Sequence, residues 1–178
     1  GIIPTKKWKK SKIGESWYAG ETLISGIGQG FVLTNPFQLV VMTSIIASNG
    51  KIVEPTILKR NEVKFRTNDK YTNAIKVIKT AMFKVVNENR GTAFKSRLED
   101  VKFSGKTGTS QVRRISISER ESEDFREKEQ EWKNRDHALF VGYIPYNDPQ
   151  YAISVIIEHG GSGASTAAPI AKQVFNFI

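Results

Sequence analysis

Two apolar runs joined by a short turn constrain the fold of this chain more than any other feature of its sequence. Residues 138–144 and 151–157 are rich in β-branched, aromatic and small apolar residues, and the connection Pro145–Pro149 has the composition of a turn. This arrangement is typical of a β-hairpin. The run that contains Lys106 precedes the hairpin, so we predict three consecutive strands of one antiparallel sheet.

Helical patterns flank the predicted sheet along the chain. An asparagine and a proline suit the start of a helix over residues 36–48, and apolar residues in 74–86 recur at helical spacing. We expect the apolar residues of this second helix, Val77 and Ile78 among them, to face the core. A third helix, rich in small residues, is predicted from Ala164 onward. The fold class is therefore α/β, of the α+β kind, with an antiparallel sheet flanked by helices.

Other segments are less regular. Gly1–Gly20 has no helical or strand periodicity and is predicted to be irregular surface, while Ile52–Val53 and Thr56–Leu58 are predicted as short strands. Segment 113–136 mixes acidic and basic residues densely, which favours an exposed helical insertion held by weak surface ion pairs. This insertion is either a lid or partner-contact arm, or a mobile solvated excursion, and we favour the second interpretation.

A short polar run lies inside the first predicted strand. Lys106-Thr107-Gly108-Thr109 brings an ammonium, two hydroxyls and backbone N–H groups within reach of one anionic or carbonyl-bearing ligand. Gly105 and Gly108 carry no Cβ, so a ligand backbone can approach closely, as if adding a strand to the sheet edge. We predict that this run is the polar edge of a binding cleft.

Composition excludes some functions and leaves others open. The 178 residues include no cysteine, which excludes disulfides and cysteine metal sites, and the formal net charge is +9. Such a charge suits nucleic acid, an anionic membrane surface or an anionic glycan. Much of the excess lies in Lys6–Lys12, and we interpret these lysines as solvated, with nucleic acid not expected as a partner. No apolar run approaches the roughly 20 residues of a membrane span, and no signal peptide or anchor is recognisable in this chain.

The polar run also carries a resemblance to a known family. Lys-Thr-Gly is a motif of penicillin-binding proteins and class A β-lactamases. With its flanking segments, in this order and spacing, the chain resembles the C-terminal part of a class B penicillin-binding protein of the cell-elongation type, called penicillin-binding protein 2. The resemblance covers almost the whole chain except about 61–71 and 113–136. The flanking segments are Tyr18–Thr22, Gly26–Gly30, Thr34–Leu39, His137–Pro145, Tyr151–Gly161 and Ala167–Ala171.

The resemblance implies a β-lactamase/transpeptidase-like fold and a reaction. In such enzymes a serine attacks the carbonyl between two D-alanines of a peptidoglycan stem peptide, and the acyl group then passes to an amine of a neighbouring strand. β-Lactams acylate the same serine. The parent protein would be anchored in the inner membrane and act at its periplasmic face. No metal or organic cofactor is implied.

The resemblance also implies roles for individual residues. Lys106 would orient a hydroxyl of a second motif and supply positive potential. The hydroxyls of Thr107 and Thr109 would hold the terminal carboxylate of the substrate, and the Thr109 N–H would complete the oxyanion hole. Gly108 would leave room for the peptide.

Two further family motifs, Ser-x-x-Lys and Ser-x-Asn, lack a convincing match. Ser48–Lys51 fits the first formally, but Ser48 falls at a predicted helix end and Asn49-Gly50 signals a turn. Tyr71–Asn73 mimics a variant of the second but is expected to begin a helix. We therefore expect residues 1–178 to be the C-terminal portion of a transpeptidase domain, incomplete on its N-terminal side. It would be inactive alone and would expose apolar surface for a missing N-terminal half or a complementary chain.

Three functions stay open, and so does the question of whether this chain is itself an enzyme. The first is part of a D,D-transpeptidase; the second is a non-catalytic module that binds peptidoglycan peptides or a cell-elongation partner; the third is a β-lactamase or β-lactam sensor. The elongation-type motifs favour the first. His137 and His159 suit a general base by residue type, but we favour structural hydrogen bonding for both.

Overall fold

The centre of the computed structural model is a three-stranded antiparallel sheet in the order β3-β4-β5. The structure describes residues 1–59, 65–67, 69–112 and 131–178. The strands are β3 (Ser104–Ser110), β4 (His137–Ile144) and β5 (Tyr151–Ile157). In the register, Gly105 lies opposite Gly142 and Val141 lies opposite Ser154. The predicted order and antiparallel sense of the three strands are confirmed.

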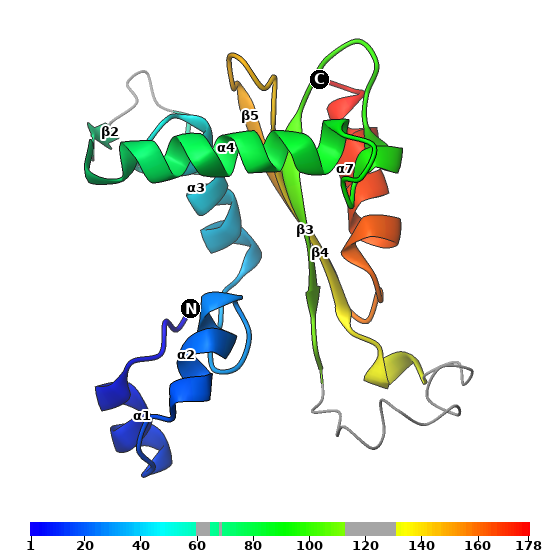
Figure 1. Cartoon of the computed structure of the whole chain (residues 1–178). Coiled ribbons are helices and arrows are strands. Elements are labelled where there is room, and N and C mark those ends of the chain that lie inside the picture. The colour runs from blue at the N-terminus through cyan, green and yellow to red at the C-terminus, as the bar shows by residue number, and fades with distance from the viewer. Residues whose placement is uncertain (60–64, 68, 113–130) are drawn as a thin grey trace.

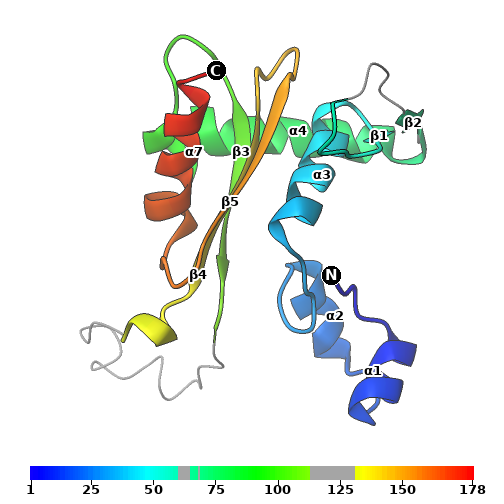
Figure 2. The same ribbon diagram turned by 180° about the vertical axis from the view of Figure 1, so that it is seen from behind.

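Helices cover both faces of this sheet, as predicted. In Figures 1 and 2, α7 (Ala168–Phe175) lies on one side of the sheet and α3 (Pro36–Ala47) on the other, and each contacts β4 and β5. The longest helix within the described residues, α4 (Thr72–Asn87), crosses the sheet against β3. A π-helical turn, η4 (Gly163–Ala167), leads into α7.

The remaining elements lie at the periphery. In Figures 1 and 2, α1 (Lys6–Ile13) and α2 (Ala19–Gly26) lie beyond the N-terminal end of α3, away from the sheet. β1 (Lys51–Val53) and β2 (Phe65–Thr67) form a separate two-stranded ribbon. Short 3-10 turns are η1 (Asp69–Tyr71), η2 (Phe94–Ser96) and η3 (Trp132–Asn134). Within the described parts of the chain, no helix is both long and apolar enough to cross a membrane.

The main core lies between the sheet and α7. Phe103 is fully buried, and its ring meets those of Phe140 and Phe175 edge to face, at centroid distances of 6.4 and 5.1 Å. Edge-to-face packing is a preferred geometry for aromatic pairs. Ala168 and Ala171 are also fully buried, so α7 presents small side chains to this aromatic cluster. The prediction of a small-residue helix packed on the sheet is confirmed.

Several local predictions were wrong. Residues 1–20 are not irregular throughout, because they contain α1, which Thr5 caps by accepting a bond from the Trp8 N–H. Thr56–Leu58 is not a strand, since the Thr56 hydroxyl accepts from the Leu58 N–H at 3.1 Å and so favours a turn over a ladder. Val77 and Ile78, expected on the buried face of α4, are 70% and 42% exposed. Most of the predicted charged insertion, 113–130, lies outside the described residues.

One lysine of the basic N-terminal run is buried. Lys9 is 1% exposed, and its ammonium lies 2.6 Å from a Glu21 carboxylate oxygen and 3.4 Å from one of Glu15. It also donates to the Ser16 carbonyl and lies 4.2 Å from the centre of the Tyr18 ring. Our interpretation of these lysines as solvated therefore fails at Lys9, which joins α1 to α2.

The ion pair makes the stability of the α1–α2 region depend on pH. Burial tends to lower the pKa of Lys9, but the contacts with Glu21 and Glu15 outweigh it and raise that pKa. The Lys9 ammonium, helped by the Tyr18 N–H, lowers the pKa of Glu21. Stabilisation from Glu21 is thus present above its unfolded pKa of about 4.3 and is lost as the pH falls through its lower folded pKa. The stabilisation from Lys9 is present below its unfolded pKa of about 10.4 and is lost as the pH rises through its raised folded pKa.

We expect Glu21→Gln to lower the unfolding midpoint of the α1–α2 region at pH 7 and to weaken its acid sensitivity below about pH 4. Trp8 and Trp17 lie in this region, so their fluorescence during thermal unfolding reports on it once Trp132, the third tryptophan, is replaced by Phe in every variant. Glu88→Gln is the matched control, because the Lys84–Glu88 pair is 55% and 53% exposed and such pairs contribute little. Equal acid sensitivity of wild type and Glu21→Gln would contradict the role given to the buried pair.

Candidate functional site

The Lys106–Thr109 run lies on an outer strand of the sheet. β4 pairs with one edge of β3, and among the described residues no other strand pairs with β3. Lys106 and Thr109 are exposed, and Thr107 and Gly108 are half-buried. Edge strands present unpaired N–H and C=O groups that can pair with an extended ligand. The run is therefore accessible on a sheet edge, in the position that its composition predicted.

A cleft of about 610 Å³ opens along this run. One wall is β3 from Lys106 to Ser110, and the facing wall is residues 27–36, which connect α2 to α3. Gly28 and Gly30 have φ of 76° and 73°, in the left-handed region that favours glycine. The glycine-rich turn thus faces the polar run across the cleft.

Two side chains from other segments bind the run directly. The Gln29 Nε2 donates to the Thr109 carbonyl at 3.1 Å, and the hydroxyls of Thr92 and Thr107 lie 2.8 Å apart. Thr92 follows Gly91, where a Cβ would overlap the Val85 carbonyl, so this turn needs glycine. Sequence reasoning missed Gln29 and Thr92, and the only local signal for either was its position beside a glycine.

The charge of the site comes from Lys106. Its ammonium donates to the Thr107 carbonyl at 2.6 Å, and within the described residues it has no carboxylate partner. An exposed ammonium that lines the same cleft as Thr107 and Thr109 can attract and orient a carboxylate ligand through charge-assisted hydrogen bonds. The same group can stabilise negative charge that develops on a reacting carbonyl.

The two histidines make structural hydrogen bonds. The His159 N–H donates to His137 Nδ1 at 2.9 Å, and His159 Nδ1 lies 3.1 Å from the Arg135 carbonyl. His137 lines the cleft beside β3, but its Nδ1 is engaged as the acceptor of a backbone N–H. Trp132 packs against His159, with a centroid distance of 4.4 Å. These contacts support the structural interpretation of both residues.

The formal Ser-x-x-Lys match does not form a nucleophile site. Ser48 follows the last residue of α3, and its hydroxyl donates to the Lys51 carbonyl at 3.0 Å. Asn49, at φ 59°, turns the chain, and the Lys51 ammonium lies 5.3 Å from the centre of the Phe65 ring. The lysine therefore points to the β1–β2 ribbon and does not activate the serine. Over the described part of the chain, no group of three or more acidic, histidine or cysteine side chains is placed to hold a metal.

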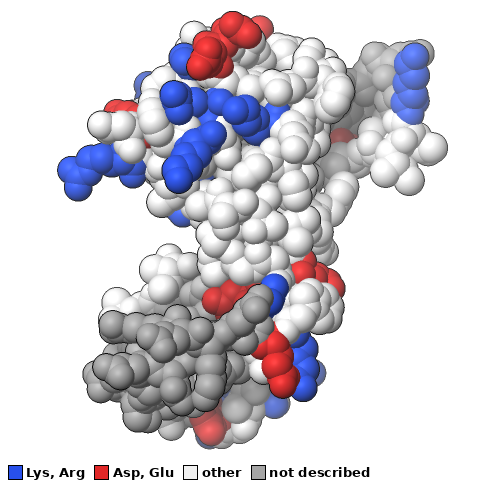
Figure 3. Space-filling view, turned by 90° about the vertical axis from the view of Figure 1, so that its right-hand side faces the viewer, with Lys and Arg blue, Asp and Glu red and all other residues white. Residues whose placement is uncertain are grey.

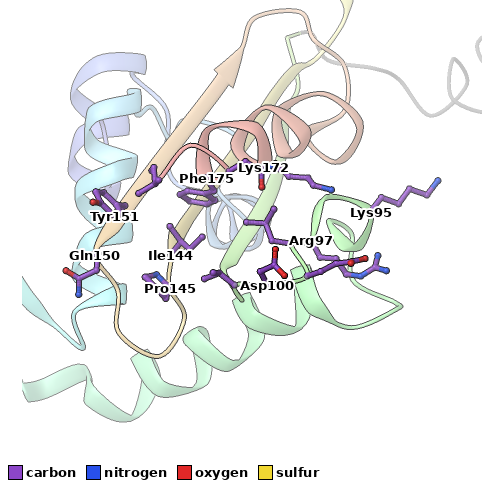
Figure 4. Close-up of a pocket in the computed structure, with 14 residues that line it drawn as sticks. Lys95, Arg97, Asp100, Ile144, Pro145, Gln150, Tyr151, Lys172 and Phe175 are labelled. Carbon is purple, nitrogen blue, oxygen red and sulfur yellow. The ribbon is translucent and has the colours of Figure 1, made fainter.

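A second cavity, of about 600 Å³, lies at the other end of the sheet (Figure 4). Phe175 and Ile144 contribute apolar walls, and Lys95, Arg97 and Lys172 are the cations among its lining residues. On the face of the molecule shown in Figure 3, several lysine and arginine side chains, in blue, cluster toward the upper left. The lining includes no residue of the Lys106–Thr109 run, so this cavity is separate from the cleft.

The sequence was compared with protein families and with curated proteins. Residues 3–176 match the family model of the penicillin binding protein transpeptidase domain. The peptidoglycan D,D-transpeptidase MrdA of Haemophilus influenzae is 33% identical, over 98% of this chain and 28% of that protein. MrdA of Acinetobacter baumannii is 35% identical, over 99% of this chain and 27% of its own length. The chain thus spans less than a third of these curated relatives.

Solved structures show the same relationship. Penicillin-binding protein PBP2 from Helicobacter pylori superposes with a TM-score of 0.78 at 28% identity, covering 99% of this chain and 31% of that one. Pseudomonas aeruginosa PBP2 in complex with WCK 5153 gives a TM-score of 0.76 at 32% identity, covering 99% of this chain and 38% of that one. These matches confirm the predicted resemblance and fold class. The chain belongs to the penicillin-binding protein transpeptidase domain family.

Proposed function

We propose that this chain is the C-terminal portion of the transpeptidase domain of a peptidoglycan D,D-transpeptidase, which cross-links stem peptides in cell-wall synthesis by serine acyl transfer. The observation that carries the proposal is the Lys106–Thr109 run on β3, at an edge that no described strand pairs with, facing a cleft. In the reaction, a serine oxygen forms an ester with the penultimate D-alanine as the terminal D-alanine leaves. An amine of a neighbouring strand then takes the acyl group.

The residues of the run have distinct roles in this proposal. Lys106 supplies positive potential and orients a hydroxyl of the second motif. The Thr107 and Thr109 hydroxyls hold the terminal carboxylate of the stem peptide, and the Thr109 N–H donates to the developing oxyanion. Gly108 leaves space for the peptide backbone. β-Lactams, which mimic this substrate, occupy the same contacts.

The nucleophile of the complete site comes from outside residues 1–178 in this proposal. Ser48 has the wrong surroundings, and large apolar side chains stand exposed on α3, on α4, and on or just after α2. Such surface favours coverage by another protein segment. We infer that the missing half of the domain, or a complementary chain, covers it. The exposed residues include Leu23 (77%), Ile27 (77%), Phe37 (54%) and Val77 (70%).

A partner class and a location are also proposed. Helicobacter pylori PBP2, 31% identical to this chain, is known in a complex with MreC. We propose a similar partner from the cell-elongation machinery for the protein that contains this chain, together with peptidoglycan stem peptides as substrates. The proposed site of action is the periplasmic face of the inner membrane.

Labelling with a fluorescent penicillin, read on a denaturing gel, tests the proposal. We expect no covalent label on residues 1–178 alone, and label on the longer protein that adds a Ser-x-x-Lys segment. Label on the chain alone that disappears in Ser48→Ala would overturn the assignment of the nucleophile to another segment.

Two other results would favour the alternative functions. Saturable binding of a D-Ala-D-Ala peptide by the longer protein, without acylation, would indicate a non-catalytic binding module. Sustained hydrolysis of a chromogenic cephalosporin would indicate a β-lactamase.

A further inference from the structure

The contact between Gln29 and the Thr109 carbonyl places a protein side chain on a backbone group that a ligand needs. An extended ligand that adds to a sheet edge bonds to the main-chain N–H and C=O groups of that edge. The Thr109 carbonyl lies on the cleft and accepts from Gln29 Nε2 at 3.1 Å. One of the two acceptor positions of this carbonyl oxygen is therefore taken before any ligand binds.

The backbone of Gln29 is held firmly in this position. Its N–H donates to the Ile24 carbonyl at 3.0 Å, and the Gly28 N–H donates to the Ser25 carbonyl at 3.0 Å. Gly30 lies so close to Ile24 that an added Cβ would be 3.0 Å from its side chain. Since the end of α2 fixes this turn, the Gln29 carboxamide can leave Thr109 by side-chain rotation alone.

We propose that Gln29 is a specificity-determining residue, whose carboxamide occupies the Thr109 carbonyl and must be displaced by the amide N–H of an incoming ligand. This inference rests on the proposed function of the cleft. A ligand with an amide beside the reacting carbonyl exchanges one hydrogen bond for another at Thr109. A ligand without that amide leaves the hydrogen bond between Gln29 and Thr109 intact. Removing the Gln29 side chain therefore does not improve the binding of such a ligand.

The size of the effect follows from the net worth of one hydrogen bond. A typical intramolecular hydrogen bond contributes about 0.5–1.5 kcal/mol, which corresponds to about two- to tenfold in an equilibrium constant. Removing the competing donor should therefore favour amide-bearing ligands by about two- to tenfold.

The test uses two β-lactams and the longer protein that carries the nucleophile. Benzylpenicillin has an acylamino side chain with an N–H, whereas imipenem has a hydroxyethyl group at the corresponding position. We expect Gln29→Ala to raise the second-order rate of acylation by benzylpenicillin by about two- to tenfold, with the imipenem rate unchanged. Gln29→Met, which keeps the length of the side chain but cannot donate, should behave like Gln29→Ala.

The matched control is Gln150→Ala. Gln150 lines the other cavity and donates to Asp148, so both rates should match wild type. A circular-dichroism melt of each variant verifies that it is folded.

Three outcomes would overturn the inference. Equal loss of both rates in Gln29→Ala would mean that Gln29 only supports β3. Unchanged rates for both drugs would mean that the carbonyl accepts both donors together or is not used by the ligand. If folded wild-type protein reacts with neither drug, the proposed function of the cleft fails, and this inference fails with it.

Discussion

Lys106→Ala is expected to lower the second-order rate of acylation by a penicillin by about 100- to 1,000-fold in the longer protein that supplies the serine. This is the range observed when one preorganised group that stabilises developing charge is removed. In the structure, the Lys106 ammonium is exposed, has no carboxylate partner among the described residues, and lies on the cleft. Its whole charge is therefore available to the ligand and the oxyanion. Stopped-flow measurement with a fluorescent penicillin gives the rate directly.

Two further variants separate charge from geometry. Lys106→Arg keeps the charge but replaces a compact ammonium with a planar fork, so we expect only partial recovery of the rate. Lys102→Ala removes an exposed lysine just before β3 and should leave the rate unchanged. A Lys106→Ala protein that is folded and reacts at the wild-type rate would contradict the role given to this residue.

Gly163→Ala is expected to destabilise the fold by about 3 kcal/mol, at the upper end of the usual cost of overpacking a core. Gly163 is buried at the start of η4, and a Cβ there would overlap the carbonyl oxygens of Gly108 and Leu139. Both oxygens belong to the backbone of paired strands and cannot shift by side-chain rotation. The added methyl group would therefore push η4 away from the sheet. Urea unfolding followed by circular dichroism measures the change.

The control for this glycine is Gly20→Ala. Gly20 lies in α2, where an added Cβ meets nothing within 4 Å, so alanine should be neutral or stabilise the helix by up to about 1 kcal/mol. Similar losses of stability in both variants would show that the close approach at Gly163 is not the cause. The Gly163 substitution also presses on Gly108, so penicillin acylation should fall in parallel.

The sheet was predictable because its signals are local. Residues 138–144 and 151–157 carry apolar strand patterns around a short turn, and these nearly match β4 and β5. α3 was predictable because Asn35 accepts a bond from the Gln38 N–H at 2.8 Å, as its residue type suggested. The polar edge of the cleft was also predictable, since Lys106–Thr109 forms one continuous segment of the sequence.

The contacts that complete the cleft were not predictable in this way. Gln29 and Thr109 are 80 positions apart in the chain, and no local pattern reports that they meet. Lys9 looked like its solvated neighbours, because only the tertiary structure brings Glu21 to it. Val77 and Ile78 follow helical spacing yet are exposed, since periodicity marks an apolar face without identifying what covers it.

The packing of α3 on the sheet has a consequence for the order in which the parts of the chain fold. α3 ends at Ala47 but packs against β5, which begins only at Tyr151. A chain that emerges N-terminus first into the compartment where it folds therefore carries an apolar helix whose partner strand arrives much later. By contrast, β4, β5 and α7 follow one another closely and can associate as soon as they emerge. We expect the C-terminal unit to form first and α3 to dock onto it, so chaperones should engage the nascent chain during the interval between them.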